Sequence, residues 1–204
     1  RTEFYPACFL KMRYIYFLLL YKVESRVLLT SKQFEITTIR MAHQLIEVHR
    51  DFSDSYIIGI QPRGVLLAER MGALISKILG KPIVVGKLDI TLHRDDLHLQ
   101  KDIIVPQRTE IDFSIEGKNV ILVDDVLYTG RTIRAALDAL IDVGRPNDIE
   151  LMVLIDRKLH RHVPVKAKYV GMTIDSIVSE KVRVSWSNID GKDEVVIEPK
   201  SVEN

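Results

Sequence analysis

Two adjacent acids, Asp124 and Asp125, follow a run of four apolar residues at positions 120–123 and precede a segment that contains threonine and glycine. The apolar run predicts a buried strand, and in open α/β sheets ligands bind at the carboxyl ends of the strands. Thr129, Gly130 and Thr132 then offer hydroxyl and backbone N–H groups where a helix begins, an arrangement that binds phosphate. Because carboxylates accept hydrogen bonds from vicinal hydroxyls, this segment predicts a site for a ribose 5-phosphate.

Other nucleotide-binding motifs do not fit this segment. A P-loop requires Gly-Lys-Ser/Thr, and the dinucleotide fingerprint requires G-x-G-x-x-G; neither occurs here. The two acids could instead cap the following helix and complement its dipole. That alternative would be preferred for an isolated Asp-Asp pair, whereas the whole string at residues 120–132 favours the phosphate site.

The elements that must position this site alternate between strand and helix. Thr30 and Gln33 form a capping box, and helical spacing then continues to about Arg50. Further helices are predicted at residues 65–79 and 132–143, and strands at 56–60, 83–88, 120–123, 149–155, 169–170, 182–184 and 195–197. This alternation predicts an α/β fold with a mostly parallel central sheet flanked by helices.

Length and composition place the chain among ordinary globular proteins. Its 204 residues are 47% hydrophobic and 28% charged, and the formal net charge of +1 excludes a polycationic nucleic-acid coat. Cys8 is the single cysteine, so no intrachain disulfide can form and a cytoplasmic location is expected.

The first 25 residues differ from the rest of the chain. Their apolar run at positions 14–21 is shorter than the roughly 20 residues of a membrane span, and the residues after it do not resemble a signal-peptide cleavage site. We expect residues 1–25 to be an N-terminal extension of uncertain role, either an added strand or helix or the product of a start site placed too far upstream. Residues 26–204 are expected to form the functional domain.

The string at residues 120–132 resembles the phosphoribosyl pyrophosphate (PRPP) signature of type I phosphoribosyltransferases. Its Tyr-Thr-Gly-Arg-Thr form is similar to that of the PyrR family, the bifunctional pyrimidine-operon attenuators that are also uracil phosphoribosyltransferases. The resemblance runs from about residue 26 to the C-terminus and includes residues 88–96 and 143–146. It implies a type I phosphoribosyltransferase fold with a small hood and a flexible active-site loop.

The resemblance also implies the substrates. PRPP and uracil would react to give UMP and pyrophosphate, with Mg²⁺ bound through PRPP rather than by direct protein ligation. In purine-using relatives an acid that contacts the purine ring stands at the position of Tyr128, so its absence counts against a 6-oxopurine substrate. Family members form homodimers or homotetramers, and no membrane partner is expected.

By the same resemblance, Asp124 and Asp125 bind the ribose hydroxyls and residues 129–132 bind the 5-phosphate. The PRPP-binding segment comprises Asp124, Asp125, Val126, Leu127, Tyr128, Thr129, Gly130, Arg131 and Thr132. The pyrophosphate loop comprises Gln61, Pro62, Arg63 and Gly64. A simple Pro-Gly turn is the alternative for this loop, and Pro62 stands where the family often has another residue.

Arg94 precedes a long polar stretch and is expected to stabilise the departing pyrophosphate. Residues 93–113 lack a clear period, and long loops inside compact domains usually serve a function. The alternative for Arg94 is a solvated charge between Asp95 and Asp96. Arg94, Asp124 and Asp125 are the expected catalytic residues.

The chemistry needs no protein nucleophile. Breaking the bond at the anomeric carbon leaves a cationic sugar and an anionic pyrophosphate, so Mg²⁺, N–H donors and exclusion of water are the expected requirements. Cys8 is therefore not expected to be catalytic, and the six histidines lack zinc-ligand spacing.

A second prediction is RNA binding. Residues 157–168 hold five Lys or Arg residues, two histidines and no acid, which suits RNA phosphates or a solvated loop. PyrR proteins bind a hairpin in pyrimidine-operon mRNA in response to UMP or UTP. The positions that match the family are Arg40, His43, His160, Arg161 and Lys166.

This chain departs from the family by an extra residue near 158–159 and by Val48 on the first helix, where relatives can carry Arg. The alternatives to the combined function are an RNA-binding attenuator with negligible catalysis and a purine phosphoribosyltransferase.

Overall fold

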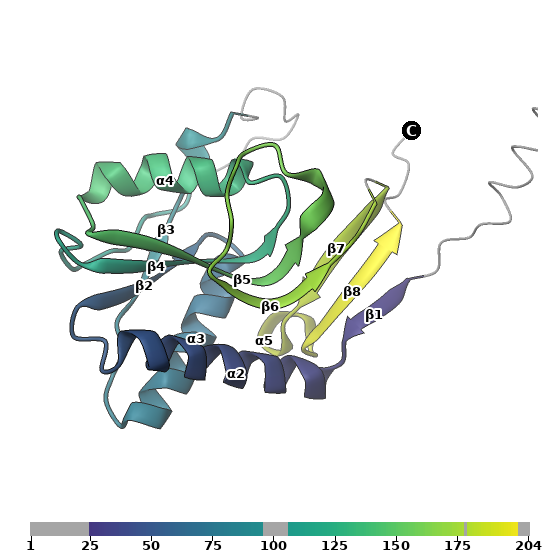
Figure 1. Cartoon of the computed structure of the whole chain (residues 1–204), viewed down its shortest axis with the longest axis horizontal. Helices are drawn as coiled ribbons and strands as arrows, with labels where there is room; N and C mark the ends of the chain where they lie inside the picture. Colours follow the sequence, from purple (N-terminus) through teal and green to yellow (C-terminus); the bar gives the residue numbers. More distant parts are fainter. Residues whose placement is uncertain (1–24, 96–105, 178, 200–204) are drawn as a thin grey trace, which may run out of the picture.

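A five-stranded parallel sheet forms the centre of the computed structural model, which describes residues 25–95, 106–177 and 179–199 (Figure 1). Its strands lie in the order β3-β2-β4-β5-β6. Their bounds are β2 (Ser55–Ile60), β3 (Val85–Leu88), β4 (Asn119–Leu127), β5 (Asp148–Arg157) and β6 (Tyr169–Ile174). The predicted α/β class is therefore confirmed.

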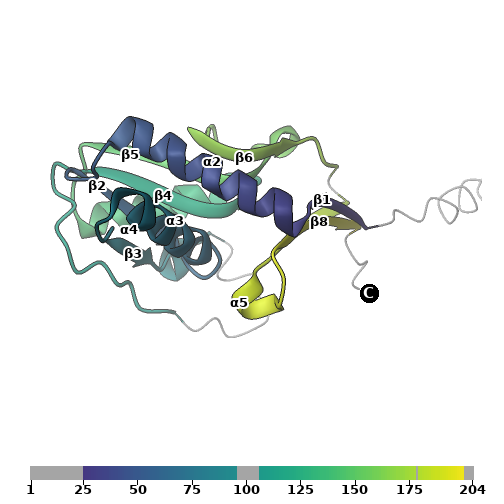
Figure 2. The same ribbon diagram turned by 90° about the horizontal axis from the view of Figure 1, so that it is seen from below.

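Helices cover both faces of this sheet. α2 (Ser31–His49) and α3 (Gly64–Leu79) lie together on one face, and α4 (Arg131–Val143) lies on the other (Figures 1 and 2). Two buried clusters result, one between the sheet and α2 with α3, the other between the sheet and α4. The apolar run of β4, residues 120–123, is fully buried because both faces are covered.

Local signals set the helix boundaries. Thr30 and Gln33 form the predicted capping box, in which the Thr30 N–H donates to Gln33 Oε1 at 3.0 Å. α2 ends before Arg50, which has φ 54°, and α3 ends before Gly80, which has φ 69°. A residue with positive φ cannot continue a right-handed helix, so both predicted ends hold within one residue.

A small antiparallel sheet stands beside the large one and forms the hood. It contains β1 (Arg26–Leu29), β7 (Glu180–Ser185) and β8 (Glu194–Pro199) in the order β1-β8-β7, with the short α5 (Ser187–Asp190) between β7 and β8. β1 was not predicted, and it adds an N-terminal strand at the edge of this sheet.

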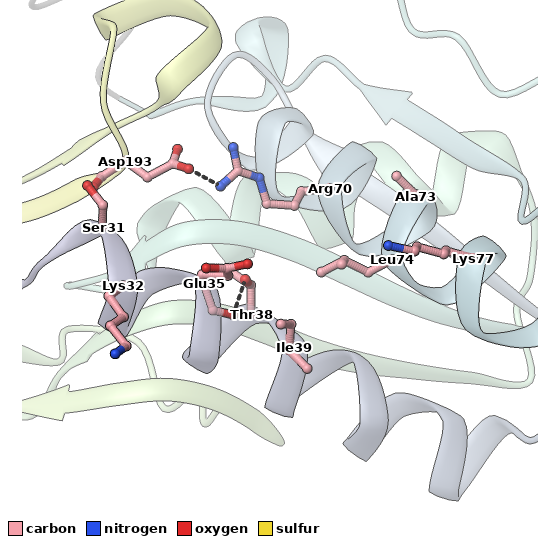
Figure 3. Close-up of a pocket in the computed structure, with 10 residues that line it drawn as sticks. All are labelled: Ser31, Lys32, Glu35, Thr38, Ile39, Arg70, Ala73, Leu74, Lys77 and Asp193. Carbon is pink, nitrogen blue, oxygen red and sulfur yellow. Dashed lines mark hydrogen bonds and ion pairs between the residues drawn. The ribbon is translucent and has the colours of Figure 1, made fainter.

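Arginine and aromatic side chains attach the hood to the helices. Phe34 of α2 meets Trp186 edge to face at 5.3 Å between ring centroids. The Arg70 guanidinium lies over both rings and pairs with Asp193 at 2.7 Å. A groove of about 640 Å³ opens beside this pair, between α2 and α3 (Figure 3).

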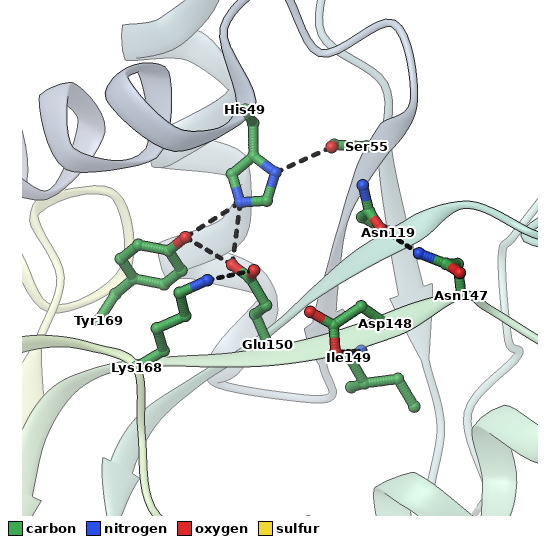
Figure 4. Close-up of polar contacts among 9 residues, drawn as sticks. All are labelled: His49, Ser55, Asn119, Asn147, Asp148, Ile149, Glu150, Lys168 and Tyr169. Carbon is green, nitrogen blue, oxygen red and sulfur yellow. Dashed lines mark hydrogen bonds and ion pairs between the residues drawn. The ribbon is translucent and has the colours of Figure 1, made fainter.

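A buried polar network closes the amino end of the sheet, away from the predicted site (Figure 4). The His49 ring lies 2.9 Å from Ser55 Oγ, 3.0 Å from Glu150 Oε2 and 3.1 Å from the Tyr169 hydroxyl. Burial lowers the pKa of His49, although Glu150 opposes this effect. Burial raises the pKa of Glu150, but hydrogen bonds from Lys168 and Tyr169 outweigh it and the net pKa is lowered.

Several strand boundaries differ from the prediction. β3 begins at Val85 rather than at residue 83, and β4 continues to Leu127 rather than ending at residue 123 because β5 pairs with it along that length. In the long polar stretch, η1 spans Thr91–His93, and Glu110 forms an antiparallel bridge with Lys87 of β3. Residues 1–24 and 96–105 lie outside the described part.

Across the described residues, no helix combines the length and the apolar character needed to span a membrane.

Candidate active site

The carboxyl end of β4 lies where the order of the strands reverses. β2 pairs with β4 only as far as Gly59 and Val123, whereas β5 accompanies β4 to Leu127. From β2 the chain continues to β3 on one side, and from β4 it continues to β5 on the other. Such a switch point opens a crevice for ligands at the carboxyl ends of the strands.

Asp124 and Asp125 lie just beyond the last pair between β2 and β4. Asp124 is 7% exposed and accepts the Asp125 N–H at 2.9 Å. Burial, followed by the charge of Asp125, raises the pKa of Asp124 well above its usual range. Burial also raises the pKa of Asp125, although the Arg63 charge opposes this effect. Two partly desolvated carboxyl groups favour a ligand that brings hydroxyl donors or a cation.

The turn after β4 presents backbone N–H groups. Gly130 has φ +87° and precedes the first residue of α4. The Tyr128 carbonyl accepts from Arg161 Nη1 at 2.5 Å, and the Thr129 carbonyl accepts from the N–H groups of His162 and Val163 at 2.9 and 3.1 Å. In a planar trans peptide the N–H points opposite to the carbonyl, so the N–H groups of Thr129 and Gly130 face away from residues 161–163. With the positive end of the α4 dipole they form a nest for an anion.

The turn after β2 lies against the same strand. A Cβ atom on Gly64 would lie 2.4 Å from the Val123 carbonyl oxygen, so only glycine allows this contact. The close neighbour of Gly64 is therefore β4 itself. The Gln61–Pro62 peptide bond is cis, and Gln61 Nε2 donates to the Arg108 carbonyl at 2.7 Å.

Arg63 extends from this turn toward the hood. Its Nη1 donates to the Val184 carbonyl of β7 at 2.8 Å, and its charge acts on Asp125. The side chain therefore lies between the acids and the hood. A bidentate contact with pyrophosphate remains a prediction.

Arg94 lies close enough to Asp124 for its charge to lower the pKa of that carboxyl group, against the larger effect of burial. The residues beside it are bound to α4: His93 Nε2 lies 3.0 Å from Asp142, and Arg131 pairs with Asp95 at 2.6 Å. Arg94, which is distant in sequence from the adjacent acids Asp124 and Asp125, thus lies at the same end of the sheet.

The RNA-binding candidates lie around β6, the edge strand of the sheet. Arg40 Nη2 on α2 donates to the carbonyls of Val170 and Gly171 at 3.3 and 2.5 Å. His43 and Lys166 are exposed and His160 is half-buried. Arg161 also pairs with Asp156 at 2.5 Å, and its side chain is 19% exposed.

Three cations of residues 157–168 have partners within the chain. Arg157 is only 4% exposed, Arg161 supports the turn after β4, and Lys168 pairs with Glu150. The stretch is a crossover between β5 and β6, so some of its cations turn inward. The sequence suggested exposed side chains because it does not show which groups of the folded chain bind them.

Two contacts of Arg157 at the site were not predicted from the sequence. The Arg157 guanidinium lies over the Tyr128 ring at 3.9 Å, and its Nε donates to Ser176 Oγ at 2.6 Å. Asp156 and Arg157 end the buried strand β5, and charged residues at the carboxyl end of a buried strand were the available signal.

The carboxylates present suit Mg²⁺ carried by a phosphorylated substrate. In residues 25–95, 106–177 and 179–199, no cluster of three or more His, Cys, Asp or Glu side chains could hold a metal ion. Asp124 and Asp125 offer two adjacent carboxyl groups instead, and Mg²⁺ often binds through one or two carboxylates together with substrate phosphates.

Comparison with known proteins gives a consistent result. Residues 26–188 match the family described as "Phosphoribosyl transferase domain". The "Bifunctional protein PyrR" of Halalkalibacterium halodurans is 46% identical over 179 residues, covering 87% of this chain and 99% of that protein. The protein of the same name from Pelotomaculum thermopropionicum is 50% identical over 158 residues, covering 78% and 87%. That of Bacillus subtilis is 43% identical over 176 residues, covering 85% and 97%.

Solved structures share the fold at lower identity. The hypoxanthine phosphoribosyltransferase of Trypanosoma cruzi superposes with a TM-score of 0.63 at 16% identity, covering 86% of this chain and 97% of that one. One from Staphylococcus aureus gives 0.61 at 19% identity, covering 86% and 93%. At these identities, the structural similarity shows a shared fold and nothing more.

Proposed function

The chain belongs to the phosphoribosyl transferase family, and within it to the bifunctional PyrR proteins, and we propose that it transfers the phosphoribosyl group of PRPP to uracil in the crevice between β2 and β4. It has the type I phosphoribosyltransferase fold, and the family resemblance inferred from its sequence is confirmed. The observation that carries the proposal is the meeting of three groups at the strand-order reversal: the acids of β4, the N–H nest before α4 and the turn after β2.

Each group has a part of PRPP to bind. Asp124 and Asp125 accept hydrogen bonds from the ribose hydroxyls, which relieves their mutual repulsion. The N–H groups of Thr129 and Gly130 and the start of α4 bind the 5-phosphate. Residues 61–64 bind the pyrophosphate, beside the Arg63 guanidinium.

The reaction separates charge at the anomeric carbon. As the bond to pyrophosphate breaks, positive charge develops on the sugar, where the adjacent carboxylates of Asp124 and Asp125 stabilise it. Arg63 and Arg94 supply positive charge to the leaving group, and each already lies near one of the two acids. Mg²⁺, when bound with PRPP, neutralises further charge on the pyrophosphate oxygens.

A base panel tests this function. Radiolabelled uracil, guanine, hypoxanthine and orotate are each incubated with PRPP, Mg²⁺ and the full-length chain, and the nucleotide products are separated. We expect UMP from uracil and no product from the other bases. Product from guanine or hypoxanthine would support the purine alternative, and no product from any base would leave the chain a nucleotide-responsive regulator.

The second activity is regulation of pyrimidine genes through RNA. We propose that UMP- or UTP-dependent binding to pyrimidine-operon leader mRNA uses the cations around β6: Arg40, His43, His160, Arg161 and Lys166. Arg161 also binds the Tyr128 carbonyl, so this surface adjoins the nucleotide site. Because PRPP and nascent mRNA are cytoplasmic, we propose that the chain acts in the cytoplasm. We also propose that it assembles as a homodimer or homotetramer.

Binding to a labelled leader RNA, with and without UMP, tests the second activity. Lys166→Ala should weaken binding, whereas Arg145→Ala, in the loop before β5, should not. Equal affinity of the Lys166 variant and the parent would refute the assignment of this surface.

A further inference from the structure

Asp89 lies directly after β3 and has no part in the proposed mechanism. Its Oδ1 accepts the Thr91 hydroxyl at 2.7 Å and the Thr91 N–H at 3.2 Å, and its Oδ2 accepts the Gln107 N–H at 3.1 Å. The Asp89 N–H in turn donates to Thr109 Oγ1 at 3.1 Å. Thr91 lies where the chain leaves β3, and Gln107 and Thr109 lie where it returns. One residue therefore joins the outgoing and the returning stem of the long polar stretch.

The returning stem, residues 106–110, is fixed against the sheet. Glu110 exchanges both backbone hydrogen bonds with Lys87 of β3, at 2.8 and 2.9 Å. The Arg108 carbonyl accepts Gln61 Nε2 at 2.7 Å, so this stem also contacts the turn after β2. It therefore provides a fixed support beside the proposed pyrophosphate turn.

The outgoing stem, residues 89–95, contains Arg94. Thr91 begins the short helix η1 and is 8% exposed, and the Arg94 N–H donates to the Thr91 carbonyl at 3.4 Å. A single turn of this kind gains little stability from its own hydrogen bonds, so its place depends on contacts with other segments. Asp89 supplies such contacts on the side of the returning stem, and α4 supplies one to the His93 carbonyl.

The charge of Arg94 must be accurately placed to serve the reaction. Burial raises the pKa of the Asp124 carboxyl group, and the nearby Arg94 charge opposes this effect. In the proposed reaction the same charge stabilises the pyrophosphate as it leaves, and a misplacement of about 1 Å can cost about 100-fold in rate. Without the Asp89 side chain, the buried Thr91 hydroxyl and the Gln107 N–H would each lose an acceptor, and the stems would lose the carboxylate that joins them.

We propose that Asp89 is a positioning residue for phosphoribosyl transfer: by joining the two stems, it holds Arg94 beside the acids of β4, where pyrophosphate departs. Asp89 acts through Arg94 and touches no reacting group. The inference rests on the proposed transferase function and adds to it a residue that aligns the cation on the leaving group. Because Arg94 stabilises charge that develops in the transition state, loss of Asp89 should lower kcat more than it alters either KM.

Asp89→Asn tests the proposal. The amide has one acceptor oxygen and one NH2 group, so it can accept from Thr91 or from Gln107 but not from both. We expect kcat to fall about 10-fold, less than the roughly 100-fold that follows removal of one preorganised donor, because Arg94 is displaced rather than lost. The KM values for uracil and PRPP should stay as in the parent. Asp112→Asn, the same change at an exposed position of the polar stretch, is the matched control and should keep the parent kcat.

A double-mutant cycle distinguishes positioning from general support of the fold. In a chain that already carries Arg94→Ala, Asp89→Asn should lower kcat by less than about twofold, because independent effects multiply, whereas a residue that acts through Arg94 has nothing left to position. A second fall of about 10-fold in the Arg94→Ala background would overturn the proposal, as would the parent kcat in Asp89→Asn. A parent chain that made no UMP would refute the transferase function, and this inference with it.

Thr91→Val covers the case in which Asp89→Asn fails to fold. It removes the hydroxyl that donates to Asp89 Oδ1 and keeps a side chain of similar size. We expect a fall of several-fold in kcat with an unchanged KM for PRPP, whereas Thr91→Ser, which keeps the hydroxyl, should retain the parent kcat. Parent kinetics in a folded Thr91→Val protein would contradict the positioning role.

Discussion

Gly64→Ala should slow catalysis strongly in a protein that still folds. The added Cβ would lie 2.4 Å from the Val123 carbonyl oxygen and 3.1 Å from the Asp124 Cα, whereas ordinary Cβ contacts begin at 3.4 Å. The turn after β2 and strand β4 must therefore move apart by about 1 Å, and a misplacement of that size can cost about 100-fold in rate. Overpacking of this kind also destabilises a protein by about 1–3 kcal/mol.

The assay compares initial rates of UMP formation with thermal unfolding. Gly80→Ala is the matched control, because Gly80 lies just after the other end of α3 with φ +69° and no heavy atom within 4 Å of its ideal Cβ. We expect the control to lose some stability to backbone strain and to retain the parent rate. Gly64→Ala should lose about 100-fold in kcat while remaining folded. A folded Gly64→Ala protein with the parent rate would refute the close coupling of this turn to β4.

Three further outcomes follow from the structure. Gly130→Ala should raise the KM for PRPP about 5- to 30-fold, because left-handed backbone costs an L-residue about 1–2 kcal/mol; an unchanged KM would argue against this turn as the phosphate nest. Since burial lowers the pKa of His49 below its ordinary 6.5, the unfolded state binds more protons, and the free energy of unfolding should fall as pH drops from 6.5 toward the folded-state pKa. Urea titrations between pH 8 and pH 5 measure this fall. If the free energy of unfolding of a His49→Asn protein had the same pH slope, the fall would not arise from His49. Lys166→Ala should reduce the slope of log K against log salt for leader RNA by about one, and an unchanged slope would exclude a phosphate contact at this lysine.

Features encoded over a few neighbouring residues were predictable from the sequence. The Thr30–Gln33 capping box and Gly80 fixed the start of α2 and the end of α3 to within one residue. The apolar run before Asp124 identified the central strand, and the residues after it identified the substrate class through the family resemblance. These signals are local, so they need no knowledge of tertiary contacts.

Features that depend on distant partners were not predictable. β1 exists because Arg26 and Val27 pair with Ile197 and Val196 of β8, at the other end of the chain. β4 extends to Leu127 because β5 accompanies it. Arg157 and Arg161 looked like surface cations because their partners, Ser176 and Asp156, could be identified only from the fold.

The central claim is that the acids at the end of β4 form the phosphoribosyl transfer site. The most direct measurement is the rate of UMP formation from labelled uracil, PRPP and Mg²⁺ by the parent and by Asp125→Asn, with folding verified by thermal unfolding. The account predicts UMP formation by the parent, and a loss of about 100- to 1,000-fold in the variant, because the amide cannot stabilise the positive charge that develops on the sugar. An Asp125→Asn protein that forms UMP at the parent rate would contradict it.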